Sequence, residues 1–88
     1  MSKWELRYGP RADKALGKLD KPVAKRIRSK LQRLTELDDP ADGLKPLAGP
    51  LVGLYRLRVG DWRVLVDVQR EALVIVAVEI DHRGSIYD

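Results

Sequence analysis

Residues 54–68 read Leu-Tyr-Arg-Leu-Arg-Val-Gly-Asp-Trp-Arg-Val-Leu-Val-Asp-Val, and most of the fold follows from this stretch. Polar and apolar residues alternate before and after Gly60-Asp61, as they do in strands that bury one face. A Gly-Asp pair between two such runs indicates a two-residue β-hairpin turn. We therefore expect strands over residues 54–59 and 62–68.

The register of this hairpin collects arginines on one face of the predicted sheet. Arg58 lies directly opposite Arg63, and Arg56 lies on the same face two residues earlier. Like charges that face each other across a strand pair destabilise a sheet, and a bridging anion would remove the conflict. The alternative is a solvated surface whose cations are balanced by acids of the later strands: Asp67, Glu79 and Asp81.

The flanking sequence completes an α+β domain. Period-two alternation predicts a first strand over residues 4–8, and the spacing of apolar residues predicts helices over 11–18 and 21–37. Residues 38–53 hold three prolines and three glycines, which is typical of a loop, and a last strand is expected over 73–80. The order β-α-α-β-β-β predicts one antiparallel sheet with both helices packed on one face and the other face open.

The last predicted strand should contribute to the arginine side. Its alternation would keep four apolar residues on the core side: Val74, Val76, Val78 and Ile80. Glu79 and Arg83 would then project toward the arginines, and Tyr87 could fold back beside them.

Composition is typical of a single globular domain. The chain has 88 residues, of which 44% are hydrophobic and 34% charged, so we expect one domain over residues 1–88. It has no cysteine and one histidine, so we expect no metal and no small-molecule cofactor. No apolar run approaches the roughly 20 residues that span a bilayer, so we expect no membrane partner. The absence of cysteine favours a reducing cytoplasm as the setting. The net charge of +4 favours a polyanionic or acidic partner.

The second predicted helix carries a run of cations with no acid before Glu36: Lys21, Lys25, Arg26, Arg28, Lys30 and Arg33. Such a run is either the solvated side of the helix or a contact to RNA and the ribosome. Spacing alone leaves both interpretations open.

Two segments resemble the toxins of the RelE/ParE superfamily. Residues 44–66 contain Leu-Lys-Pro-Leu-Ala-Gly and then Gly-Leu-Tyr-Arg-Leu-Arg-Val-Gly-Asp-Trp-Arg-Val-Leu-Val, which looks like the central signature of RelE-type toxins. Residues 81–87, Asp-His-Arg-Gly-Ser-Ile-Tyr, look like their terminal His-Arg-x-x-x-Tyr segment. The similarity covers nearly the whole chain and implies the RelE-like microbial RNase-type fold.

The resemblance implies the toxin of a bacterial type II toxin–antitoxin pair, and within it the RelE-like branch that cleaves mRNA in the ribosomal A site. The implied partners are a cognate antitoxin, the ribosome and mRNA. The family's catalytic residues fall on five positions of this chain: Arg56, Arg58, Arg63, Arg83 and Tyr87.

The chemistry of metal-independent RNA cleavage suits these residue types. The RNA's own 2′-OH attacks the phosphate, so a base must take its proton, cations must stabilise the phosphorane and an acid must protonate the leaving oxygen. Tyr87 is the candidate base, and the arginines would clamp the phosphate. Arg83 is a candidate on the leaving-group side, although arginine is a poor acid. His82 is therefore a second candidate proton donor. The alternative is that His82 is a structural residue that makes hydrogen bonds at the end of the sheet.

Three other functions remain open from the sequence. A ParE-like toxin has the same fold but acts on DNA gyrase. A non-catalytic RNA-binding or ribosome-associated module would use the same basic surface without Tyr87. A decayed toxin would retain only antitoxin binding. The joint presence of the arginines and Tyr87 favours the RelE-like branch.

Overall fold

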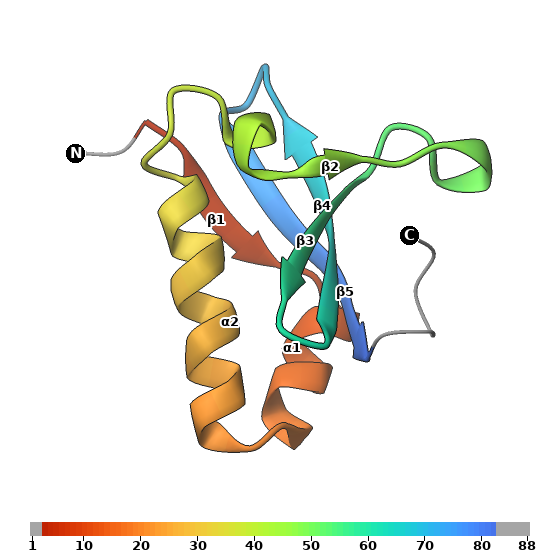
Figure 1. Cartoon of the computed structure of the whole chain (residues 1–88). Coiled ribbons are helices and arrows are strands. Elements are labelled where there is room, and N and C mark those ends of the chain that lie inside the picture. Colours follow the sequence, from red (N-terminus) through yellow and green to blue (C-terminus); the bar gives the residue numbers. More distant parts are fainter. Residues whose placement is uncertain (1–2, 83–88) are drawn as a thin grey trace.

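The computed structural model describes residues 3–82 (Figure 1). Its strands and helices, in chain order, are β1 (Glu5–Tyr8), α1 (Pro10–Lys18), α2 (Lys21–Leu34), β2 (Lys45–Pro46), β3 (Tyr55–Val59), β4 (Trp62–Gln69) and β5 (Val74–His82). Two 3₁₀ turns, Pro40–Gly43 and Gly49–Leu51, flank β2. Within residues 3–82, no helix is long and apolar enough to cross a membrane.

The hairpin between β3 and β4 forms in the predicted register. Arg58 pairs with Arg63, and Val59 pairs with Trp62. Gly60 takes a φ of 61° in the turn, a left-handed conformation that glycine adopts without the strain a Cβ would bring. Local turn chemistry is therefore enough to align the two strands.

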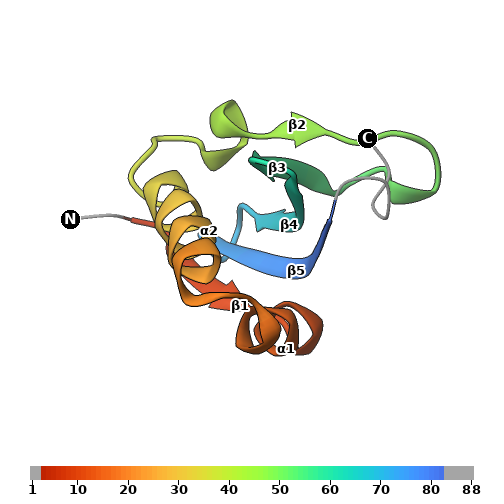
Figure 2. The same cartoon turned by 60° about the horizontal axis from the view of Figure 1, so that its bottom comes forward.

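The sheet is mixed, and the prediction of a purely antiparallel sheet is wrong at β1. The five strands follow the order β1-β5-β4-β3-β2, which Figure 2 shows across the molecule. β1 runs parallel to β5 and pairs Glu5 with Val74 through Tyr8 with Ala77. The first and last strands are far apart in sequence, so no turn sets their relative direction. At the other edge, the predicted loop contains β2, which pairs antiparallel to β3.

Both helices pack on one face of the sheet, as predicted. The buried residues on α1 are Ala12 and Leu16, and those on α2 are Ile27, Leu31 and Leu34. They form one core with the inward residues of the sheet, Leu57, Val59, Val64, Val66, Ile75, Ala77 and Ile80. Burying such aliphatic side chains is the main force that holds helices to a sheet.

α2 ends three residues earlier than predicted. Its last residue is Leu34, and Thr35 caps it with a side-chain hydroxyl that donates to the Gln32 carbonyl at 2.6 Å. Leu37 lies beyond the helix and is 39% exposed, so it does not extend the buried stripe. Asp20 precedes the first residue of α2, and its side chain makes no capping hydrogen bond.

The opposite face of the sheet is open only in part. Leu47 and Leu65 form a second apolar cluster, with Leu51, Leu54 and Val78 packed against it. The segment between β2 and β3 therefore covers one end of this face. The arginines lie on the remainder of this face.

A β-bulge changes which side chains of β5 face the core. The β4–β5 register shifts between Leu65 and Val66, so Ile75 and Ala77 lie in the main core and Val78 lies in the second cluster. The predicted core side of Val74, Val76 and Val78 is therefore wrong, and that of Ile80 is confirmed. A bulge inserts one residue, so the alternation before it is out of phase with the alternation after it.

Candidate functional site

Three arginines share the face of the β3–β4 hairpin that points away from the helices, and we call this surface the arginine face: Arg56, Arg58 and Arg63. Arg56 and Arg63 are 8% and 7% exposed, whereas Arg58 is exposed to solvent. Charged side chains are seldom buried to this degree unless their surroundings compensate them. The arginine face is thus a packed arrangement with one outward-facing cation.

Asp81 extends this arrangement on the third strand. It pairs with Arg63 in the β4–β5 ladder, so Arg63 lies between Arg58 on one side and a carboxylate on the other. An opposite charge directly across a strand pair is favourable. One of the acids expected to balance the arginines, Asp81, therefore does lie beside Arg63. Arg58 still faces the like-charged Arg63.

Glu79 lies opposite Leu65 in the β4–β5 ladder, but its carboxylate pairs with an arginine of α1. Its carboxylate oxygen Oε1 lies 3.6 Å from Nη1 of Arg11 on α1, and the two residues line one shallow hollow beside that helix. β1 pairs with β5 only as far as Ala77, so the part of β5 that follows has no strand on that side and α1 lies close to it. The structure thus gives Glu79 an ion-pair partner on α1, whereas Asp81 is the carboxylate opposite Arg63.

His82 lies on the helix-covered side of the sheet. It pairs with Trp62, and the two rings meet edge to face with centroids 5.1 Å apart. Trp62 packs against the main core. The structure therefore does not bring the imidazole to the arginine face, and the geometry gives no support to His82 as the proton donor.

A basic hollow of about 490 Å³ opens beside the arginine face. The charged residues that line it are Lys30, Asp42, Lys45, Arg56 and Arg58. They come from α2, the turn before β2, β2 itself and β3, so the tertiary structure alone assembles them. Lys45 was missed in the sequence because it lay in a predicted loop, and only its pairing with Arg56 reveals its place.

The cations of α2 do not form one surface. Lys30 lines the basic hollow, whereas Lys21, Lys25 and Arg28 line a separate hollow of about 470 Å³ between the two helices. The guanidinium of Arg28 also lies 5.3 Å from the centre of the Tyr8 ring, a cation–π distance. Arg26 and Arg33 are exposed.

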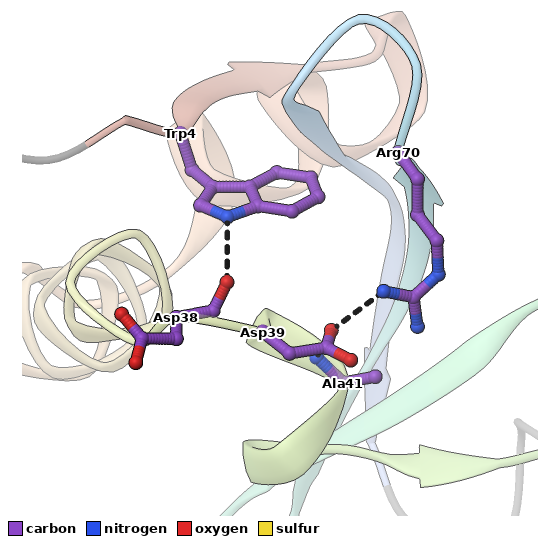
Figure 3. A network of polar contacts seen from close by, with 5 residues as sticks. All are labelled: Trp4, Asp38, Asp39, Ala41 and Arg70. Carbon is purple, nitrogen blue, oxygen red and sulfur yellow. Dashed lines mark hydrogen bonds and ion pairs between the residues drawn. The ribbon is translucent and has the colours of Figure 1, made fainter.

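A polar network ties the segment before β2 to the rest of the domain (Figure 3). The Trp4 indole Nε1 donates to the Asp38 carbonyl at 3.2 Å, and Arg70 Nη1 lies 2.9 Å from Asp39 Oδ1. Asp39 Oδ1 also accepts from the Ala41 N–H at 3.1 Å. These contacts link the end of α2 to β1 and to the β4–β5 turn, and so help to position β2 next to Arg56.

The network predicts an acid-sensitive contribution to stability. The hydrogen bond from Arg70, followed by that from Ala41, lowers the pKa of Asp39 below its ordinary value. Because the folded-state pKa is depressed, the stabilisation is complete above the unfolded pKa of about 4 and is lost as the pH falls through the folded value. Asp39→Asn should lower stability at pH 7 and flatten its dependence on pH below about 4. Urea melts of both proteins from pH 2 to 7 measure this, and a parallel pH dependence would contradict it.

Arg83 and Tyr87 lie outside the described residues, as does the end of the terminal signature. Among residues 3–82, no group of three or more His, Cys, Asp or Glu side chains could hold a metal ion. The candidate site of the described residues is therefore the arginine face together with the basic hollow.

Comparisons with known proteins find similar chains in toxin–antitoxin complexes and a similar toxin sequence. A chain of the toxin–antitoxin complex RelBE2 from Mycobacterium tuberculosis is 26% identical, with a TM-score of 0.82 and 97% of each chain covered. The archaeal RelE–RelB complex from Pyrococcus horikoshii OT3 contains a chain that is 26% identical, with a TM-score of 0.73 over 98% of this chain and 100% of that one. A sequence from Methanocaldococcus jannaschii with the provisional name toxin RelE4 is 29% identical over 96% of this chain and 90% of its own length.

The mixed sheet, the two helices on one face and the cationic hairpin together define a toxin of the RelE/ParE superfamily. The family described as ParE toxin of type II toxin–antitoxin system, parDE, matches residues 6–87. The chain belongs to this family of type II toxins, and the predicted superfamily and fold class are confirmed.

Proposed function

We propose that this toxin is a ribosome-dependent endoribonuclease that cleaves mRNA in the A site and that a cognate antitoxin neutralises it. The observation that carries the proposal is the cation pair Arg58–Arg63 beside the buried Arg56. Like charges held in register across two strands suit an anion that binds between them. The related structures are those of RelE–RelB and RelBE complexes, which supports an antitoxin as partner.

The proposed reaction needs no oxidant or reductant, because both the attacking oxygen and the leaving oxygen belong to the RNA. The 2′-oxygen forms a bond to phosphorus as it loses its proton, and the bond from phosphorus to the 5′-oxygen breaks as that oxygen gains a proton. The products are a 2′,3′-cyclic phosphate and a 5′-hydroxyl. In this scheme Tyr87 takes the 2′ proton, Arg56, Arg58 and Arg63 stabilise the phosphorane charge, and Arg83 acts on the leaving oxygen.

A ParE-like action on DNA gyrase is the second candidate, because the matching family is that of ParE toxins. It would make no use of a cation pair at a scissile phosphate. The two functions therefore differ in whether loss of Arg58 abolishes toxicity.

Induced expression without an antitoxin separates the two functions. We expect growth to stop because translation stops, and primer extension on a translated message should show new 5′ ends within A-site codons. The cuts should require ribosomes. Intact mRNA together with trapped gyrase–DNA breaks would identify the ParE-like function, and cutting of naked RNA would contradict the ribosome dependence.

The exposed cations of α2 should serve ribosome engagement and leave the chemistry unchanged. Lys25 and Arg26 are exposed, and neither lines the basic hollow. Changing both to glutamine should weaken ribosome binding and lower the slope of log K against log salt by about 0.7–0.9 for each phosphate that is no longer neutralised. The single-turnover rate of cleavage at saturating toxin should stay close to that of the wild type. A large loss in that rate would place these residues in the active site.

The antitoxin should act by covering the arginine face. We expect acidic groups of the bound antitoxin near Arg56, Arg58 or Arg83, or displacement of the terminal segment that contains Tyr87. Charge pairs buried in an interface couple strongly, so Arg58→Gln should weaken antitoxin binding, mainly through faster dissociation. Surface plasmon resonance measures this rate, and an unchanged rate would argue against occlusion of this face.

A further inference from the structure

The basic hollow contains two lysines that the five implied catalytic positions do not include. We propose that Lys45 and Lys30, together with Arg56, form a second phosphate subsite, which binds the phosphate next to the scissile one on a single RNA strand. This inference rests on the proposed function and extends it, because it assigns a substrate contact on each side of Arg56.

The sheet register places two pairs of cations on the same face, one on each side of β3. Arg58 pairs with Arg63 of β4, and Arg56, two residues earlier in β3, pairs with Lys45 of β2 on the other side of the strand. Residues two apart on a strand lie about 6.8 Å from each other, which is comparable with the separation of successive phosphates in a nucleic acid strand. Arg56 and Arg58 have this spacing, and their partners Lys45 and Arg63 add a second cation on either side of β3, so the two pairs suit two phosphates held diagonally across that strand.

The surroundings of the second pair are also suited to a phosphate. Arg56 is 8% exposed and thus held in place by its neighbours, whereas Lys30 and Lys45 are exposed at the mouth of the hollow. A fixed guanidinium gives direction to the contact, and ammonium groups add charge without a strict geometry. Among the residues of the 3–82 range that line the hollow, Asp42 is the one carboxylate, against four cations. The hollow therefore keeps a clear positive excess.

The position of the hollow favours RNA over an acidic peptide as its occupant. Arg58 lines the hollow and also belongs to the pair at the proposed scissile phosphate. One continuous strand can therefore occupy both pairs without leaving the surface. Because the backbone charge of RNA does not depend on its bases, this subsite should raise affinity equally for all sequences.

Direct binding to the free, full-length chain tests the subsite without any need for cleavage. The probe is a short 2′-O-methyl oligouridylate, which lacks the nucleophilic hydroxyl, followed by fluorescence anisotropy. Lys45→Gln and Lys30→Gln should each weaken binding by about tenfold and lower the salt slope by about 0.7. Lys14→Gln on α1 removes the same charge at an exposed position away from the hollow and should have little effect.

A neutral methylphosphonate sharpens the test. Placed at successive linkages, it should weaken wild-type binding at two adjacent positions. At one of them, Lys45→Gln should weaken binding no further, because the charge it would meet is already absent. If Lys45→Gln and Lys30→Gln bind the probe as Lys14→Gln does, the subsite is wrong. If a poly-aspartate peptide binds with the same dependence on Lys45 while no methylphosphonate has an effect, the hollow takes protein carboxylates and the proposal is overturned.

The outcome is separable from that of the proposed function. RNA binding that depends on Lys45, in a chain that leaves ribosome-bound mRNA intact, would keep the subsite and reject the nuclease. A-site cleavage with binding that is indifferent to both lysines would keep the nuclease and reject the subsite.

Discussion

Arg58→Gln should lower the rate of ribosome-bound mRNA cleavage by about 10²-fold or more while leaving the domain as stable as before. Arg58 is exposed and faces Arg63, so its removal relieves a repulsion. Stability should stay the same or rise by about 0.2–1 kcal/mol. In the transition state the same guanidinium would donate charged hydrogen bonds to the phosphorane, and glutamine replaces them poorly.

Arg63→Gln is the matched variant, and unlike Arg58→Gln it should lower the stability of the domain. Arg63 is 7% exposed and lies between Arg58 and Asp81 in the sheet. Glutamine is shorter and uncharged, so the change removes the cation opposite Asp81 and part of a buried side chain, at a cost of about 1–3 kcal/mol. Cleavage should fall in both variants, and only Arg63→Gln should lower the midpoint of a urea melt. If Arg58→Gln unfolds the domain and spares cleavage, the arginine face is structural.

Tyr87→Phe should abolish most cleavage if Tyr87 takes the 2′ proton. Phenylalanine keeps the ring and removes the one group that could act as base, and general base catalysis contributes about 10²–10⁴-fold. Single-turnover rates on ribosomes that carry a defined A-site codon measure the effect. The pH dependence of the rate gives a second readout, since the rise with pH that reports ionisation of the base should disappear in the variant.

His82→Gln is the control for this assignment. The imidazole packs edge-on against Trp62, on the side of the sheet away from the arginines. We expect cleavage within a few-fold of the wild type and a modest loss of stability, because an aromatic pair contributes about 0.5–1.5 kcal/mol. A fall in cleavage as large as that of Tyr87→Phe would make His82 a candidate proton donor again.

Much of the fold could be predicted because its signals are local. The hairpin turn is set by Gly60-Asp61, and once the turn is known the partners of every residue in β3 follow. The buried stripe of α2 at Ile27, Leu31 and Leu34 follows from helical spacing in the same way. Such features depend on neighbours within a few residues, which the sequence displays directly.

The inward face of β5 could not be predicted, because a bulge interrupts its alternation. Apolar residues occupy both phases of the strand, since Ile75 faces the main core and Val78 faces the second cluster. A strand that is apolar on both faces gives no sign of where the phase changes. The contact of Glu79 with Arg11 was hidden for a related reason, because it depends on where α1 lies against the sheet.

The hairpin and the pair Arg58–Arg63 follow from the sequence alone, because adjacent strands joined by a tight turn have one register. The family also follows from the sequence alone, because its characteristic segments can be read directly from the chain. The tertiary fold was needed to establish that β1 lies parallel to β5, that Asp81 faces Arg63, and that Lys30 and Lys45 meet Arg56 in one hollow. These are contacts between segments distant in the chain, and their geometry follows from how the helices and strands pack into a single core, not from any local pattern.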